Sequence, residues 1–232
     1  MKKLNMLSHV LVFVLACCLL TGCTSSTSKG DTEAQSEQQN AVTPTADVYA
    51  DIEIEEYGTI TVALDSTSAP VTVENFVKLA TDGFYDGLTF HRIIKDFMMQ
   101  GGDPNGNGTG GSGETIVGEF TQNGHKNYLS HTRGAISMAR SMAYDSASSQ
   151  FFIVHQDSNF LDGSYAVFGY VTEGIEIVDQ ICEGAEPTDN NGTIPAEAQP
   201  VIKTITIREK EEIKNELPVR YGQEVFRCGL FL

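Results

Sequence analysis

The segment from residue 90 to residue 103 combines side chains that can bind an apolar group and stabilise charge without covalent chemistry. Arg92 has a permanently charged guanidinium with several N–H donors in a fixed fork. Phe97 and Met98 are apolar, and Gln100 offers both a donor and an acceptor. This pattern indicates electrostatic stabilisation beside an apolar pocket.

The two sides of this segment differ if it is a strand. Arg92 and Ile94 then share one face, and His91 points to the other. If Arg92 faces a groove, His91 is expected to be a hydrogen-bonded core histidine.

Other chemistries have no matching pattern. The histidines beyond the first 22 residues form no H-x-x-x-H or H-E-x-x-H pair, so no metal site is expected. There is no G-x-S-x-G sequence for serine hydrolysis. The run Gly106–Gly111 matches G-x-G-x-x-G but has no clear strand before it and no helix after it, so we interpret it as a surface loop with positive φ angles. We therefore expect neither a metal nor a cofactor.

Composition indicates a folded, acidic protein. Of 232 residues, 41% are hydrophobic, and the formal net charge is −16. A nucleic-acid partner is not expected, because nucleic-acid binders usually present a basic face.

The first 46 residues are predicted to lie outside the folded domain. Two lysines precede an apolar run of eleven residues, which is shorter than the roughly 20 needed to span a bilayer and is typical of a secretory signal. The run ends at Leu20-Thr21-Gly22-Cys23, which resembles a bacterial lipobox, so residues 1–22 are interpreted as a lipoprotein signal peptide and Cys23 as the lipidated residue. The alternative is an ordinary secretory signal with an incidental cysteine. Residues 24–46 are polar and complete a flexible tether, 23–46.

Cleavage before Cys23 would change the net charge from −16 to −18, because two lysines and no acid are lost. Cys182 and Cys228 would then be the remaining thiols, and two cysteines so far apart make no metal motif.

Alternation and helical spacing predict mostly strands in residues 47–210. A hairpin is expected over residues 48–64, turning at Tyr57-Gly58, and a helix over 71–82 that Thr72 caps and Gly83 follows. A second helix is expected over 175–182. Further strands are expected over 88–94, 134–139, 149–155, 165–171 and 201–208. Strands outnumber helices and do not alternate with them, which favours an all-β barrel or sandwich. Residues 211–232 are a C-terminal tail of unknown role.

Five motifs in order resemble the cyclophilin family: Phe90–Asp103, Asn107–Gly111, Ser137–Arg140, Ser149–Ile153 and Leu161–Gly163 with Val167–Gly169. The resemblance implies a closed eight-stranded antiparallel barrel capped by two α-helices. It also implies peptidyl-prolyl cis-trans isomerase activity on proline-containing polypeptides, with Arg92 and Gln100 as catalytic residues. It implies a substrate-binding set of Phe97, Met98, Ala139, Arg140, Gln150, Phe152, Phe160, Leu161 and Tyr165.

Three residues depart from the pattern of many eukaryotic members: Phe160 replaces a tryptophan, Tyr165 a histidine and Arg140 an asparagine. The last two are similar to the bacterial branch. We expect a monomeric isomerase, lipid-anchored on the extracytoplasmic side of the cell membrane, that assists the folding of secreted or surface proteins. The alternative is a low-turnover peptide-binding chaperone or scaffold that uses the same groove.

Overall fold

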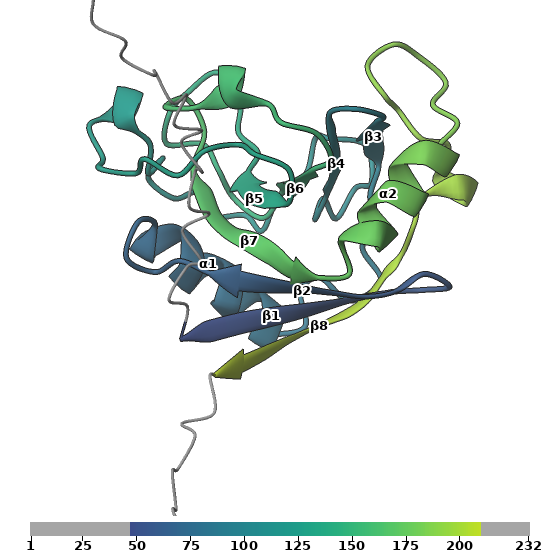
Figure 1. Cartoon of the computed structure of the whole chain (residues 1–232), viewed down its shortest axis with the longest axis horizontal. Coiled ribbons are helices and arrows are strands. Elements are labelled where there is room, and N and C mark those ends of the chain that lie inside the picture. The colour runs from purple at the N-terminus through teal and green to yellow at the C-terminus, as the bar shows by residue number, and fades with distance from the viewer. Residues whose placement is uncertain (1–46, 210–232) are drawn as a thin grey trace, which may run out of the picture. The chain divides into compact units, whose positions relative to one another are not determined.

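The computed structural model describes residues 47–209. These residues form one eight-stranded antiparallel sheet in the order β3-β4-β6-β5-β7-β2-β1-β8, with two α-helices packed against it (Figure 1). The strands are β1 Val48–Ile54, β2 Gly58–Leu64, β3 Arg92–Ile94, β4 Met98–Gly101, β5 Ala135–Met138, β6 Phe151–Val154, β7 Val167–Glu173 and β8 Ile202–Glu209. The helices are α1 Pro70–Thr81 and α2 Ile175–Gly184.

The all-β prediction is confirmed, but the closed barrel is wrong, because the sheet is an open half-barrel that ends at β3 and β8. Between its two ends, Phe90 donates its N–H to the carbonyl of Pro200 (2.9 Å) and Ile202 donates to Leu88 (2.8 Å). Gly87 also donates to Ile202 (2.8 Å), and Thr89 and Val201 form an isolated bridge. These contacts do not extend into a regular strand pairing, since β3 has only three residues and starts after Phe90. Of the expected strand 88–94, only residues 92–94 are therefore regular.

The hairpin β1–β2 and both helices lie where the sequence predicts them. The capping of α1 differs from the prediction. The helix starts at Pro70, and the carboxylate of Glu119, from a distant loop, accepts the N–H groups of Val71 (3.1 Å) and Thr72 (2.8 Å). Thr72 donates its hydroxyl to the same carboxylate (2.7 Å), so it is not the cap. A carboxylate at this end also complements the helix dipole.

The main core lies on one face of the sheet, under α1 and α2. Phe76 of α1 is fully buried among three aromatic rings, at centroid distances of 5.3 Å from Tyr85, 5.5 Å from Phe151 and 5.2 Å from Phe168. Such tilted and edge-to-face pairs are favourable beyond their burial. This cluster fixes α1 on the sheet.

Cys182 of α2 is a buried free thiol, and burial raises its pKa to about 12. Such a thiol stays protonated and unreactive near neutral pH. The other cysteines, including Cys23, the predicted lipidation site, lie outside the described residues, as does the predicted tail 211–232.

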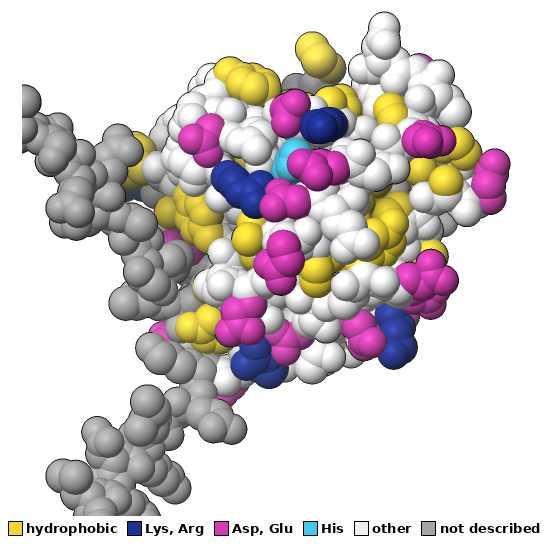
Figure 2. Space-filling model, turned by 45° about the vertical axis from the view of Figure 1, so that its right-hand side comes forward, with side chains coloured by type: hydrophobic (Ala, Val, Ile, Leu, Met, Phe, Trp, Pro, Cys, Tyr) yellow, Lys and Arg dark blue, Asp and Glu magenta, His cyan; other side chains and the backbone are white. Residues whose placement is uncertain are grey.

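Among residues 47–209, no helix is long and apolar enough to cross a membrane. The face seen in Figure 2 carries scattered acidic side chains with basic ones between them, in keeping with the net charge of −16.

Candidate active site

The central strands place polar and apolar side chains in one row on the face opposite the main core. The register pairs Arg92 of β3 with Gln100 of β4, Gln100 with Phe152 of β6, and Phe152 with Ser137 of β5. Because side chains alternate along a strand, these residues share one face, whereas Ile93, Met99 and Ile153 enter the core. The row therefore runs from the cation of Arg92, through Gln100 and the ring of Phe152, to Ser137.

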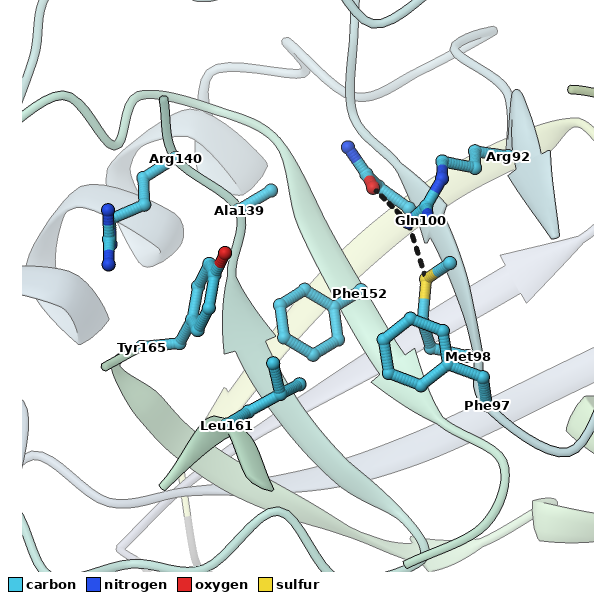
Figure 3. Close-up of a pocket in the computed structure, with 9 residues that line it drawn as sticks. All are labelled: Arg92, Phe97, Met98, Gln100, Ala139, Arg140, Phe152, Leu161 and Tyr165. Carbon is cyan, nitrogen blue, oxygen red and sulfur yellow. Dashed lines mark hydrogen bonds between the residues drawn. The ribbon is translucent and has the colours of Figure 1, made fainter. Parts of the chain in front are cut away.

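This face is hollowed into a pocket of about 210 Å³, which has room for a single side chain (Figure 3). Its lining consists of Arg92, Phe97, Met98, Gln100, Ala139, Arg140, Phe152, Leu161 and Tyr165. The apolar members belong to a second, smaller cluster around the buried side chains of Met98 and Phe152. The pocket therefore has an apolar floor with charged groups at its rim.

The structure brings together nine of the eleven residues predicted from the sequence as catalytic or substrate-binding. The other two lie beside the pocket. Gln150 is hydrogen-bonded to Gln100. Phe160 lies on the rim and is 75% exposed, with its ring 5.6 Å from that of Phe97.

Arg92 is held at the rim by contacts with three residues. Its Nε donates to the carbonyl of Asn191 (2.7 Å), and Nη1 donates to Oε1 of Gln100 (3.3 Å) and lies 3.7 Å from the sulfur of Met98. The other terminal nitrogen, Nη2, has no hydrogen-bond partner among the described residues. Partial burial lowers the pKa of Arg92 from its ordinary value, and an arginine in a protein still stays protonated.

A chain of amides supports this arginine. Gln100 donates its Nε2 to Oε1 of Gln150 (2.9 Å), and Gln150 donates its Nε2 to the carbonyl of Gly110 (2.8 Å). Each amide is thereby fixed in one orientation, with the Gln100 oxygen turned to Arg92. The loop that ends this chain is the glycine-rich run, where Gly102, Gly106, Gly108 and Gly113 have positive φ as expected.

Arg140 lies at the opposite end of the pocket, beyond the ring of Tyr165 (Figure 3). Its guanidinium carbon is 4.7 Å from the ring centre of Tyr165, 5.0 Å from Phe120 and 5.2 Å from Tyr144. Nε and Nη2 donate to the carbonyl of Ser164 and Nη1 to that of Ser141. The charge is thus enclosed by rings and carbonyls, an arrangement that no sequence pattern predicted.

A buried chain of polar groups behind the pocket was not foreseen. His131 bridges Asp162, with Nδ1 2.8 Å from Oδ1, and Ser137, with Nε2 3.1 Å from Oγ. The His131 ring stacks on Phe152 at 5.9 Å. Burial lowers the pKa of His131 against the opposing effect of Asp162, so the ring is neutral near pH 7. His131 and Ser137 are both 0% exposed, so this Asp–His–Ser chain supports Phe152 and cannot act as a nucleophile.

His91 lies in the core as predicted, but not in the expected hydrogen-bonded state. Neither of its ring nitrogens has a hydrogen-bond partner within the described part of the chain. Burial lowers its pKa and favours the neutral ring. Residues 47–209 also contain no cluster of three or more metal-ligating side chains.

Fold and site together define a class of protein: an antiparallel half-barrel with a pocket for one apolar side chain beside an arginine. The family model described as "Cyclophilin type peptidyl-prolyl cis-trans isomerase/CLD" matches residues 49–211. The chain belongs to the cyclophilin family and is a peptidyl-prolyl cis-trans isomerase.

Its relatives include bacterial isomerases. Peptidyl-prolyl cis-trans isomerase B of Bacillus subtilis is 48% identical over 131 residues, covering 56% of this chain and 88% of that protein. A peptidyl-prolyl cis-trans isomerase of Helicobacter pylori is 46% identical over 138 residues, covering 59% and 81%. The crystal structure of a cyclophilin-type isomerase of Cryptosporidium parvum, in the presence of the dipeptide Ala-Pro, has 29% identity and a TM-score of 0.61. It covers 70% of this chain and 99% of that one.

Proposed function

We propose that the pocket holds the proline ring of a client polypeptide and that Arg92 stabilises the twisted prolyl amide. The barrier to rotation, roughly 18–20 kcal/mol, comes from amide resonance, and rotation breaks no covalent bond. Uncatalysed, the exchange takes tens to hundreds of seconds. As the amide twists, the prolyl nitrogen regains its lone pair and can accept a hydrogen bond. A cation aimed at that nitrogen therefore binds the transition state better than the ground state.

One observation carries this proposal: within residues 47–209, the Nη2 of Arg92 has no hydrogen-bond partner, and it lies at the rim of an apolar pocket of one-residue size. Asn191 and Gln100 hold the rest of the guanidinium, so little reorganisation is needed when the amide twists. The Ala-Pro dipeptide named with the Cryptosporidium structure supports a proline-containing substrate for this chain as well.

Replacing Arg92 with alanine tests the mechanism. Arg92→Ala should lower kcat/KM for an Ala-Pro test peptide at least about tenfold, equivalent to about 1.4 kcal/mol of lost transition-state stabilisation. A protease-coupled assay measures the rate, and circular dichroism checks the fold. Arg208→Ala is a control for the loss of an arginine, because Arg208 is an exposed residue of β8 and does not line the pocket.

An Arg92→Ala variant as fast as the wild type would contradict the mechanism. A wild type that binds proline peptides without accelerating isomerisation would favour the other function, a peptide-binding chaperone or scaffold.

We further propose that the enzyme assists the folding of secreted or surface proteins from a lipid anchor at Cys23, on the extracytoplasmic side of the cell membrane. The support is the sequence alone: the charged start, the short apolar run, the lipobox-like ending and the polar stretch up to residue 46. All of these residues lie outside the described part of the chain. A monomer suffices for this function, because one chain supplies every residue that lines the pocket.

A further inference from the structure

A second, shallower hollow adjoins the pocket. It is about 520 Å³ in volume and is lined by Gln122, Arg140, Ser141, Met142, Tyr144 and Tyr165. We call it the flanking site. It shares Arg140 and Tyr165 with the pocket, so the two are continuous. A polypeptide with its proline in the pocket therefore has neighbouring residues within reach of the flanking site.

The flanking site exposes apolar side-chain surface. Met142 is 95% exposed and Tyr144 is 42% exposed. Together they present an apolar wall beside a site for peptides. Methionine is unbranched and polarisable, so it adapts to side chains of different shape.

The loop that presents Met142 is fixed before any ligand arrives. Ser141 donates its N–H (3.0 Å) and its hydroxyl (2.8 Å) to Oγ of Ser146, which donates to the carbonyl of Ala143 (2.6 Å). Asp145 accepts the N–H of Gly118 (3.0 Å) and the amide of Asn123 (2.8 Å), which ties the loop to a second segment. Binding there would lose little loop entropy.

The surroundings of Arg140 make the flanking site more favourable for an apolar side chain than for an acidic one. Three nitrogens of Arg140 already donate to backbone carbonyls, and its charged plane lies among three aromatic rings. An acidic side chain would have to compete with those carbonyls, whereas an apolar one would contact Met142 and the exposed part of Tyr144. The surface thus offers ring faces and a thioether.

We propose that the flanking site binds a bulky apolar side chain of the client, close to the isomerising proline. This inference rests on the proposed function of the pocket and names the sequence context that it prefers. Because an extended chain advances roughly 3.3 Å per residue, the shared wall of Arg140 and Tyr165 limits that side chain to about two residues from the proline.

The test uses the full chain and a set of peptides with one proline. Gly, Leu, Phe or Glu is placed in turn at each position from two before to two after the proline, and kcat/KM is measured for each peptide. At one position, Leu and Phe should exceed Gly by about threefold to tenfold, as expected for burial of part of an apolar side chain. Met142→Ala should bring that ratio close to one, and Met142→Leu should keep it. The control is Tyr128→Ala, because Tyr128 is 79% exposed and outside the flanking site, and it should leave the ratio at its wild-type value.

Equal rates for Gly, Leu and Phe at every position would overturn the inference while leaving the proposed function intact. A preference for Glu would also overturn it, since Arg140 would then act as a free charge. A preference that survives Met142→Ala would overturn it as well. A wild type that isomerises none of the peptides would overturn the proposed function first, and this inference with it.

Discussion

Arg92 and Arg140 share one pocket but differ in what surrounds their charge. Nη2 of Arg92 has no partner at the rim in the part of the chain that the structure describes, whereas all three nitrogens of Arg140 donate to backbone carbonyls. Arg92 can therefore donate to an acceptor that appears only as the prolyl amide twists. Arg140 instead holds the side chains of the pocket wall in place. On this basis we assign Arg140 a positioning role and keep Arg92 as the candidate catalytic residue.

The amide chain behind Arg92 gives a graded prediction. Gln100→Leu removes the acceptor of Nη1 at nearly constant volume and should lower kcat about tenfold, the effect of about 1.4 kcal/mol of lost orientation of the guanidinium. Gln150→Leu is one step further from Arg92 and should have a smaller effect. Both kcat and KM are measured by exchange NMR, and KM should change less than kcat. Equal losses for the two variants would argue against a chain of support.

At the scale of elements, a chain of polar contacts through His155 links α2 to the hairpin β3–β4, which carries part of the pocket. Asp179 of α2 accepts two bonds from Arg133 (2.6 and 2.7 Å) and lies 3.2 Å from Nε2 of His155. Nδ1 of His155 accepts the backbone N–H of Asp96 (2.9 Å), and the backbone N–H of His155 donates to the carbonyl of Phe97 (2.9 Å). Phe97 is therefore placed by a chain of bonds that starts in a helix.

Asp179→Asn should lower the free energy of unfolding by about 1–2 kcal/mol at pH 7, because a bidentate, partly buried ion pair is lost. The bond from Arg133 lowers the pKa of Asp179 in the folded state. Its stabilisation is therefore complete above the unfolded pKa, near 4, and is lost as the pH falls through the lower folded value. Urea unfolding at pH 7 and pH 3 should show the difference between wild type and variant shrinking in acid.

The matched control is Asp82→Asn, since Asp82 forms an exposed pair with Lys78. It should change stability at pH 7 by less than about 0.5 kcal/mol. Equal losses of unfolding free energy in the two variants would show that the link between α2 and the hairpin stabilises the fold no more than an exposed ion pair does.

The sequence predicted some of the helices and strands and missed others. Local patterns predicted the hairpin β1–β2 and both helices because their periods need no distant partner. They did not predict β4 as a strand, since Met98–Gly101 reads as part of a motif and becomes regular only by pairing with β3 and β6. The cap of α1 was missed for a similar reason, because Glu119 is 47 residues from Thr72 along the chain.

Prediction of the site likewise succeeded for local motifs and failed for contacts between distant residues. The motif residues were predictable as a set, and nine of them meet in one pocket. The cage around Arg140 and the His131 chain depend on side chains from separate loops, and no local spacing brings those together.

For the whole molecule, the proposed anchor at Cys23 would decide where the isomerase meets its substrates. If Cys23 carries lipid, Cys23→Ser should move the protein from the membrane fraction to the soluble fraction. Acyl chains anchor by hydrophobic burial, which salt does not screen, so wild-type retention should also survive a high-salt wash. Fractionation with immunoblotting measures this, and Cys182→Ser is the control because Cys182 is buried in α2. Unchanged retention of Cys23→Ser would contradict the anchor.

The open ends of the half-barrel would matter if, as proposed, the enzyme acts on chains that are still folding. An exposed strand edge can add an extended segment of another polypeptide and seed aggregation. Here the backbone beside β3 is already engaged, because Ile93 donates to Gly192 (2.8 Å) and Ile194 donates to His91 (3.0 Å). At the other end, β8 carries the charged side chains of Lys203 and Arg208, which disfavour such pairing. The enzyme can thus bind a client through side chains in its pocket without becoming a template for that client's misassembly.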